Sequence, residues 1–358
     1  MKVINDSGRQ AVARIEDGGG GDAGDEPTDL TKRIEKSGAR EMIVFVAGAT
    51  GAIGRPLVSA LVAARHEVIG MTSSERGLKV LQNYGADGVV ANAFDPGAVN
   101  AAIGRVRPDA VIEELTSLPR DYTPEAMRAA APRDRKVRLE GGQNVHQAAR
   151  AAGVKRYLVQ STGFFYGPGD GLASETDSLA VNASPGVSGS VRTYLQVEER
   201  VLGSPDLPGV ALRYGFFYGP GTYHDPDTGS VTRQVREQRY PVIGSGAGVY
   251  SFIHVEDAAA ATVAALESDP GVYNIVDDDP SELRVWLPAF ARFVAAPPPP
   301  QITEQEAQAL GPDAIYYATR LRGARNDLAK RNLAFSPRRL EWLSKATLQF
   351  GAGPILAG

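Results

Sequence analysis

The sequence predicts an α/β protein of the Rossmann type, with a doubly wound parallel sheet and a smaller C-terminal lobe. Two observations support this fold class. From Met42 onward, short apolar runs alternate with amphipathic helical stretches, which is typical of parallel strands joined by right-handed helical crossovers. The first apolar run, MIVFVA, leads directly into GATGAIG at residues 48–54, a glycine-rich turn between a buried strand and a helix.

The individual elements follow in order along the chain. Strands are expected at residues 43–47, 66–71, 88–91, 109–113, 156–161 and 209–215, where short apolar runs occur. Helices are expected at residues 55–65, 96–106, 132–152 and 190–202. After about Tyr214 the periodicity weakens and Gly, Pro and Asp become frequent. This change predicts a smaller lobe, with AAPPPP at residues 295–300 as a stiff connector and a helical final stretch of about 50 residues.

The glycine-rich turn has the residues that a dinucleotide site needs. Gly48 permits a tight turn, Gly51 lets backbone N–H groups approach a pyrophosphate, and Gly54 lets the helix pack against the strand. The sequence therefore predicts that residues 42–215 form mainly a dinucleotide-binding domain. Residues 216–358 are then mainly a substrate-binding lobe, interleaved with the sheet.

The second strand bears on which dinucleotide binds. NAD sites usually carry an Asp or Glu at the end of this strand, which holds the ribose 2′-hydroxyl. Here the strand runs into MTSSERG without an acid at its tip. Ser73, Ser74 and Arg76 offer hydrogen bonds to a 2′-phosphate, whereas Glu75 opposes it. We therefore expect NADP(H) in preference to NAD(H), with a solvated helix residue as the alternative for Arg76.

Composition excludes several classes of function. Of 358 residues, 43% are hydrophobic and 22% are charged, as in globular proteins, and the net charge of −4 argues against nucleic acid or an anionic membrane as partner. The absence of cysteine excludes disulfides, thiolate metal sites and cysteine nucleophiles, and the four histidines have no metal-ligand spacing. No apolar run reaches the ~20 residues of a membrane span. Residues 1–41 are polar and glycine-rich, so we expect a disordered tail, or an upstream start, before a cytoplasmic domain.

Several motifs occur in a recognisable order: GATGAIG, PDAVIEEL, AARAAGVKRYLVQSTGFFYGPGD, LRYGFFYGPG, SFIHVEDAAAATVAALE, GVYNIVDDDP and NDLAKRNLAFSP. In this order they resemble the extended short-chain dehydrogenases/reductases of the NAD(P)-dependent epimerase/dehydratase family, from about Val44 to Trp342. The resemblance implies an enzyme that is often a homodimer, with helices flanking the active site as the interface. It assigns the cofactor contacts to Gly48, Thr50, Gly51, Ala52, Ile53, Asn92, Ala93, Leu115, Thr116, Gln160, Tyr194, Tyr214, Gly215, Phe216 and Phe217.

The catalytic residues depart from the family pattern. Thr162 matches the catalytic Ser/Thr, or is a hydroxyl that bonds the strand end. The family's Tyr-x-x-x-Lys pair falls within SVRTYLQVEERVL at residues 190–202 in one of two registers. Either Tyr194 is the tyrosine and Glu198 replaces the lysine, or Ser190 and Tyr194 occupy the two positions. We prefer the second register, which aligns EERVL, and both lack the lysine that lowers the pKa of the phenol.

Four further side chains are candidates for contacts with substrate. Glu113 lies where the family places residues near the cofactor. His224 is either an acid or base or a solvated loop histidine, and we favour the loop. Tyr166 and Tyr218 are either proton donors or packed parts of the cleft wall. The aspartates at 277–279 are read as a turn entering a helix rather than as a metal site.

Three functions remain open at this stage. The first is an atypical oxidoreductase that acts on a small oxygenated organic substrate, with Thr162 as hydroxyl donor and Tyr194, or a nearby tyrosine, as proton partner. The second is an epimerase, dehydratase or lyase without net redox change, in which Glu113 or His224 acts as base. The third is a catalytically silent dinucleotide-binding sensor. We expect the first.

Overall fold

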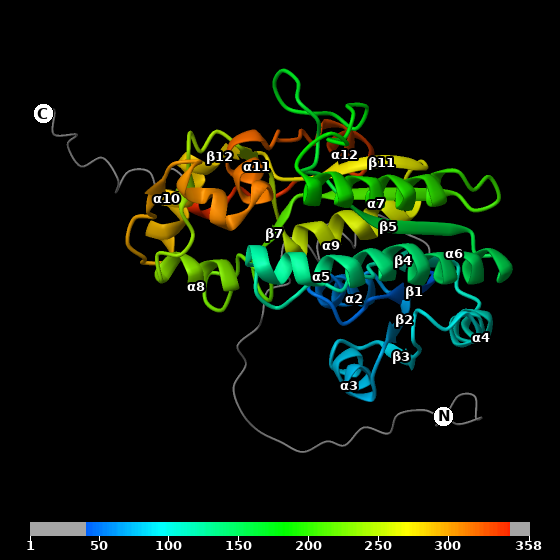
Figure 1. Cartoon of the computed structure of the whole chain (residues 1–358). Helices are drawn as coiled ribbons and strands as arrows, with labels where there is room; N and C mark the ends of the chain where they lie inside the picture. Colours follow the sequence, from blue (N-terminus) through cyan, green and yellow to red (C-terminus); the bar gives the residue numbers. More distant parts are fainter. Residues whose placement is uncertain (1–40, 344–358) are drawn as a thin grey trace, which may run out of the picture. The chain divides into compact units, whose positions relative to one another are not determined.

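A parallel sheet of seven strands forms the centre of the protein. The computed structural model describes residues 41–343. The strand order is β11-β6-β5-β4-β1-β2-β3, and every neighbouring pair is parallel (Figure 1). The strands are β1 (Ile43–Ala47), β2 (Glu67–Thr72), β3 (Asp87–Val90), β4 (Ala110–Glu113), β5 (Arg156–Thr162), β6 (Gly209–Tyr214) and β11 (Gly271–Ile275). The order reverses between β1 and β4, which is where ligands bind in open sheets of this type.

Helices cover both faces of this sheet, as the doubly wound prediction requires. One face packs against α2 (Gly54–Ala63), α3 (Glu75–Asn83), α9 (Val255–Ala264) and α12 (Asp327–Asn332). The other face packs against α4 (Pro96–Val106), α6 (Gly142–Ala151) and α7 (Pro185–Leu202). Because β1, β4, β5 and β6 are buried almost throughout, they read as nearly continuous apolar runs, which explains why the sequence predicts them.

The C-terminal lobe consists of short strands and helices around an aromatic core. Its strands pair as β7 (Phe216–Tyr218) with β10 (Phe252–His254), β8 (Val242–Ile243) with β13 (Gln301–Ile302), and β9 (Val249–Tyr250) with β12 (Ser281–Glu282). Its helices are α8 (Ser230–Arg236), α10 (Leu283–Phe293) and α11 (Pro312–Arg320). Trp286 and Trp342 are fully buried in this core, where they contact Phe252 and Phe290.

The helix expected at residues 132–152 is longer and is interrupted. It begins as α5 (Pro124–Lys136), passes through a π-helical turn (Val137–Gly141) and continues as α6. The sequence predicted a start near Pro132, which lies inside α5. The start is instead fixed by Thr123, whose Oγ1 accepts a hydrogen bond from the backbone N–H of Ala126 at 3.2 Å, with Pro124 in the first turn.

Other boundaries also differ from the prediction. The helix expected from Ser190 begins at Pro185, and α3 and the edge strand β11 were not predicted. No helix within residues 41–343 is both long and apolar enough to cross a bilayer. The predicted disordered tail lies outside the described residues except for Glu41, and so does the end of the stretch expected to be helical.

Candidate active site

The glycine-rich turn connects β1 to α2 at the switch point of the sheet. Gly48 has φ +90°, and a Cβ atom there would lie 2.4 Å from the carbonyl oxygen of Glu114, which follows β4. A Cβ atom on Gly54 would lie 2.3 Å from the carbonyl oxygen of Gly48. These two positions therefore require glycine for the turn itself. At Gly51 the corresponding distance is 3.2 Å, so its small size matters less for folding and leaves room above the turn.

The start of α2 is suited to an anionic ligand. The helix has no side-chain cap, and the backbone N–H groups of Ala52, Ile53 and Gly54 have no acceptor in the described structure, so they can bind phosphate oxygens. Thr50 and Ala52 are half-buried, Gly51 is exposed and Ile53 is buried at this position. The residues present thus fit the pyrophosphate of a nicotinamide dinucleotide, and the cofactor would supply a hydride acceptor or donor to the site.

The predicted adenosine contacts lie at the ends of β2 and β3. Ser73 and Arg76 are exposed, and within the described chain the guanidinium of Arg76 has no hydrogen bond or ion pair. Asn92 is exposed and accepts a hydrogen bond from the backbone N–H of Phe94 at 3.1 Å, while Ala93 is buried. The sheet order places β2 and β3 on the same side of β1, so these four residues lie along one edge of the expected cofactor position.

Two unpartnered polar atoms mark the end of β5. Oγ1 of Thr162 and Oε1 of Gln160 are buried and have no hydrogen-bond partner in the described structure. Thr162 is only 2% exposed, so its hydroxyl is shielded from water. An orphaned buried hydroxyl costs free energy unless a ligand satisfies it. Thr162 is therefore available as a donor to a bound molecule, as its predicted role requires.

Glu198 is held beneath α7 in a buried ion pair. Its carboxylate accepts two hydrogen bonds from Arg213 on β6, at 2.8 Å from Nε and 2.7 Å from Nη2. It accepts a third from the hydroxyl of Ser161 at 2.6 Å, and both charged side chains are 6% exposed. This carboxylate is thus fully engaged with the sheet.

Tyr194 lies one turn before Glu198 and faces a different set of groups. Its ring centroid is 6.4 Å from that of Phe165, just beyond Thr162, and 4.8 Å from the guanidinium carbon of Arg138 in the π-helical turn. Burial raises the pKa of the Tyr194 phenol, and the Arg138 cation opposes this rise. Ser190, one further turn away, is half-buried.

The loop after β4 is tied to the same region. The backbone N–H of Ser117 donates to Asp134 on α5 at 2.6 Å, and the other oxygen of Asp134 accepts from Nε of Arg138 at 2.7 Å. Leu115 is half-buried and Thr116 is exposed just before this anchor. The sequence did not predict Arg138 and Asp134, because a helix pattern without the π turn does not indicate which side chains face the site.

The two glutamates at the end of β4 point to opposite faces of the sheet. Glu113 lies among α6 and α7, where it accepts hydrogen bonds from Tyr157 at 2.5 Å and from Arg200 at 2.7 Å. Glu114 accepts a hydrogen bond from Tyr214 at 3.1 Å, and burial raises its pKa to about 8. Both carboxyl groups are thus buried in the core, where the two hydrogen bonds to Glu113 share its Oε2 and Oε2 of Glu114 has no partner in the described structure.

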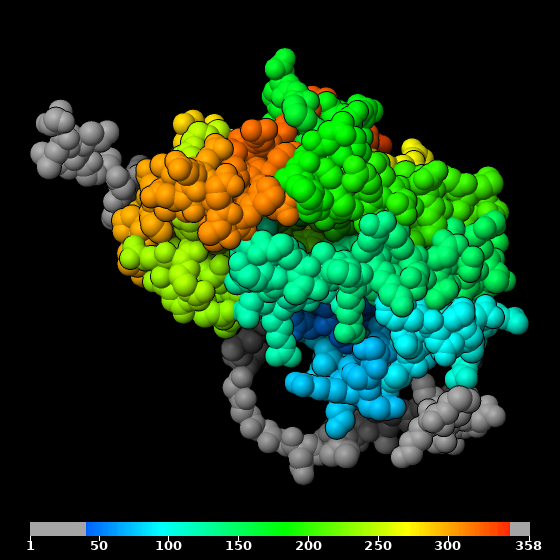
Figure 2. Space-filling model, viewed as in Figure 1, coloured from blue at the N-terminus to red at the C-terminus, as the bar shows by residue number. Residues whose placement is uncertain are grey.

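Aromatic side chains form a wall beside the strand ends. The rings of Phe164 and Phe216 stack with centroids 4.0 Å apart, and that of Tyr317 on α11 lies 6.1 Å from Phe216. Tyr122 precedes α5 and lies 5.0 Å from the ring of Tyr223. The surface is hollowed where α5, α7 and the orange α11 meet (Figure 2), and each of these regions carries a half-buried tyrosine, namely Tyr122, Tyr194 and Tyr317.

His224 is not a solvated loop histidine, so that expectation was wrong. It is 2% exposed, its ring is surrounded by aromatic side chains, and its Nδ1 lies 3.2 Å from the carbonyl oxygen of Phe217. Burial lowers its pKa to about 4, so the ring is neutral at physiological pH. The loop reading failed because GPGTYHDPDTG is rich in turn residues but folds back over the lobe core.

The remaining predicted tyrosines are packed. The hydroxyl of Tyr166 donates to Asn274 at 2.5 Å and accepts from Arg213 at 2.9 Å. Tyr218 is fully buried against His254 and Trp342. Tyr214 and Phe217 have ring centroids 5.2 Å apart, and a Cβ atom on Gly215 would lie 2.5 Å from the carbonyl oxygen of Ser251. These residues after β6 shape the wall of the site from behind.

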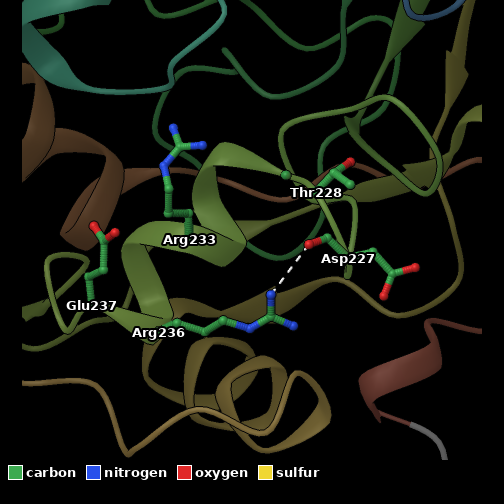
Figure 3. A pocket seen from close by; sticks show the side chains of 6 residues that line it. Asp227, Thr228, Arg233, Arg236 and Glu237 are labelled. Carbon is green, nitrogen blue, oxygen red and sulfur yellow. Dashed lines mark hydrogen bonds between the residues drawn. The ribbon is translucent and has the colours of Figure 1, made fainter.

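The aspartates at 277–279 lie in a bend that leads into β12 and then α10, rather than directly into a helix as expected. Oδ1 of Asp277 accepts from the backbone N–H of Asp279 at 3.0 Å. A separate arginine group lies on α8. A surface depression is lined by Asp227, Thr228, Gly229, Arg233, Arg236 and Glu237. Arg236 donates to the carbonyl oxygen of Asp227 (Figure 3), and Arg233 pairs with Asp121. Both arginines thus have protein partners, and the residues that line this depression do not include the strand ends.

A glycine-rich turn at the switch point of a parallel sheet, followed by an uncapped helix, defines a dinucleotide-binding protein of the Rossmann type. The family model described as "NAD dependent epimerase/dehydratase family" matches residues 44–276, and the chain belongs to this family. Family and relatives together identify the chain as a nicotinamide-dependent enzyme.

Relatives within the family include reductases and epimerases. A Streptomyces sp. protein named 3-diazoavenalumate denitrifying reductase is 40% identical over 307 residues, covering 84% of this chain and 98% of that protein. A ketoreductase from Stigmatella aurantiaca, which acts on 4-hydroxy-2-methyl-3-oxo-4-farnesyl-3,4-dihydroquinoline-1-oxide, is 27% identical over 69% of this chain and 71% of its own. The structure of UDP-glucose 4-epimerase from Thermus thermophilus in complex with NAD matches with a TM-score of 0.64 and 25% identity, over 84% of this chain and 96% of that one.

Proposed function

We propose that this enzyme is a reductase that uses NADP(H) in preference to NAD(H) and acts on a small, flat, oxygenated substrate, with an aromatic diazo carboxylate as the substrate class. The observation that carries the proposal is the buried, unpartnered Thr162 hydroxyl at the end of β5, which is followed by Phe164, stacked on Phe216, and by Phe165, whose ring lies 6.4 Å from that of Tyr194. Aromatic side chains favour stacking with a planar ring.

The protonated state of Tyr194, which lacks a lysine partner on α7, fits chemistry that runs in the reducing direction. In an oxidation the tyrosine must take a proton from an alcohol, so a cation that lowers its pKa is useful. In a reduction the phenol must start out protonated, and burial of Tyr194 favours that state. A raised pKa is therefore compatible with a donor that gives its proton to a substrate oxygen.

A diazo compound suits such a centre because nitrogen is a leaving group. In the quinone diazide form, protonation of the ring oxygen gives a hydroxyarenediazonium ion. Its carbon accepts a hydride, the C–N bond breaks and N₂ departs, so one hydride and one proton convert the substrate to a phenol. Tyr194 and Thr162 would donate hydrogen bonds to the oxygen, while the aromatic wall aligns the ring. The name of the Streptomyces relative, a reductase that denitrifies a diazo compound, supports this class.

The preference for NADP(H) is supported by the end of β2. Arg76 has no partner in the described chain, and the strand tip has no acid to hold a ribose 2′-hydroxyl. We expect Arg76→Ala to weaken NADPH binding by about tenfold, the equivalent of ~1.4 kcal/mol, and to leave NADH binding unchanged. Lys79→Ala on the same helix is the matched control. Equal effects of Arg76→Ala on both cofactors would contradict the preference.

The epimerase and lyase alternative has less support. It needs a free base, but Glu113 is doubly hydrogen-bonded and His224 is enclosed. A nucleotide-sugar substrate also needs cations for its diphosphate, and Arg233, Arg236 and Arg239 all have protein partners. We therefore retain the reductase.

The proposed assembly is a homodimer through α5 and α7. Helix α5 has no buried residue in the single chain, and α7 exposes Leu195 and Leu202 to 37% and 40%. Exposed leucines beside an unburied helix are typical of an interface. Leu195→Glu is expected to shift the dimer to a monomer in light scattering.

The test of function uses a hydroxyarenediazonium carboxylate with NADPH deuterated at the transferable position. We expect NADPH oxidation, release of N₂ and one deuterium on the carbon that carried the diazo group. Tyr194→Phe should lower kcat by about 10²-fold, as for loss of a general acid, with cofactor binding unchanged. A panel of ketones and aldehydes runs in parallel. Turnover of ketones alone would overturn the proposed diazo substrate class but not the proposed reductase function. Absence of cofactor binding would overturn both proposals.

A further inference from the structure

One cation lies beside the phenol of Tyr194, which in the first of the two registers is the tyrosine that the family pairs with lysine. Arg138 is 3% exposed, and its guanidinium carbon lies 4.8 Å from the centroid of the Tyr194 ring. It comes from the π-helical turn between α5 and α6, not from α7. Single π turns inside α-helices occur frequently at functional sites, because the extra residue redirects the side chains around it.

The position of Arg138 is fixed from two sides. Its Nε donates to Asp134 at 2.7 Å, and the same carboxylate anchors the loop after β4 through the N–H of Ser117. Its backbone carbonyl accepts a hydrogen bond from Arg200 on α7 at 3.0 Å. Because α5, the β4 loop and α7 all hold this residue, the cation is kept at one place relative to Tyr194.

The guanidinium also keeps unused donors. Nη1 and Nη2 of Arg138 donate to no group within residues 41–343, so two nitrogens of a buried cation have no protein acceptor. A buried guanidinium is expected to use its donors. Those donors belong to a guanidinium that lies beside the half-buried Tyr194, one of the residues that the resemblance assigns to the cofactor.

We propose that Arg138 is a positioning residue that replaces the family's lysine from another helix, by holding the Tyr194 ring and stabilising its phenolate after proton donation. The expected effect of Arg138 on catalysis rests on the proposed reductase function, whereas its expected effect on the pKa of Tyr194 does not. The charged and titratable groups around the pair are Asp134 on α5, Glu113 and Glu114 at β4, Arg200 on α7 and Tyr317 on α11. Of these, Asp134 is the anion that counteracts Arg138 at the phenol.

The test titrates Tyr194 without cofactor or substrate. Position 194 is substituted with difluorotyrosine, whose phenol titrates at lower pH, and the midpoint is followed by fluorine NMR. Arg138→Gln is expected to raise the midpoint by about one pH unit, since the nearest cation is lost, whereas Arg138→Lys should restore most of it. Arg135→Gln, which removes an exposed charge from the same helix, should change nothing.

A second variant is expected to shift the Tyr194 midpoint in the opposite direction, so a general loss of folding cannot account for both results. Asp134→Asn removes the opposing anion, so it should lower the Tyr194 midpoint. In the loaded enzyme, Arg138→Gln should lower kcat by about tenfold or more with KM for substrate nearly unchanged. An unchanged midpoint in folded Arg138→Gln would overturn the proposal. A shifted midpoint without any reductase activity would overturn only the proposed function.

Discussion

The two registers of α7 lead to different outcomes when Glu198 is changed to Gln. If Glu198 takes the place of the lysine, its carboxylate faces the cofactor and its neutralisation should alter binding. In the structure it instead forms a bidentate ion pair with Arg213, with both side chains 6% exposed. Glu198→Gln therefore leaves the Arg213 guanidinium buried without a counter-charge.

The expected loss of stability is large. Removal of one partner of a buried ion pair costs about 3–5 kcal/mol, because the remaining charge stays desolvated. The amide retains one acceptor oxygen, so we take the lower end, about 3 kcal/mol. At roughly 2–4 °C per kcal/mol for chains of 150–250 residues, the Tm should fall by about 6 °C or more.

The assay compares thermal unfolding with cofactor affinity in the same samples. Glu199→Gln, an exposed neighbour on α7, controls for loss of charge. A double variant, Glu198→Leu with Arg213→Met, should recover much of the stability, since an apolar pair replaces the ion pair. If Glu198→Gln melts like Glu199→Gln but binds NAD(P)H differently, the structural assignment of Glu198 is refuted.

Three further predictions address the strand ends. Gly48→Ala should raise the Kd for NAD(P)H by tenfold or more and lower the Tm, because its φ is +90° and its Cβ would lie 2.4 Å from the carbonyl oxygen of Glu114; Gly51→Ala, at 3.2 Å, should fold normally. Thr162→Val should lower kcat by about 10²-fold without lowering the Tm, since the buried hydroxyl has no partner in the described structure; a fall in Tm would indicate a structural role. Glu114→Gln should flatten the pH dependence of stability. Folding raises the pKa of Glu114 from 4.5 to about 8, so between these pH values the native state holds a proton that the unfolded state has lost, and the free energy of unfolding falls as the pH rises. If urea unfolding gave the variant the same dependence of stability on pH as the wild type, this prediction would be contradicted.

Most strands of the sheet could be predicted because the signal for each strand lies in its own residues and in the turn beside it. β1 and the turn after it are visible as an apolar run followed by glycines at fixed spacing, and the structure needs glycine at 48 and 54 for steric reasons. The edge strand β11 was missed because GVYNI lies in a stretch rich in Gly, Pro and Asp, and pairs only through the distant β6. Pairing between strands that lie far apart in the sequence produces no hydrophobic periodicity from which an edge strand can be predicted.

The site was less predictable because its charges pair across elements. Glu113 was expected near the cofactor from its position after β4, which does not reveal that Tyr157 and Arg200 engage it on the other face. Likewise, the Thr123-Pro124 pair gives a helix start that sequence reading could have used, whereas nothing in the sequence indicates the π turn that brings Arg138 to Tyr194.

In the second register, where Tyr194 occupies the lysine position, the nearby Arg138 gives a physical reason for the absence of a lysine at position 194. A lysine at position 194 would place its ammonium within reach of Arg138, and two like charges ~5 Å apart repel by about 3 kcal/mol at an effective dielectric constant of 20. The cation at position 138 and the tyrosine at position 194 are therefore coupled. Tyr194→Lys should destabilise the protein by about this amount, and adding Arg138→Met should recover most of it, giving a coupling energy of ~1–3 kcal/mol in a double-mutant cycle. Additive effects in urea unfolding would show that the two positions do not share a charge site, and that the lysine was lost for a reason unconnected with Arg138.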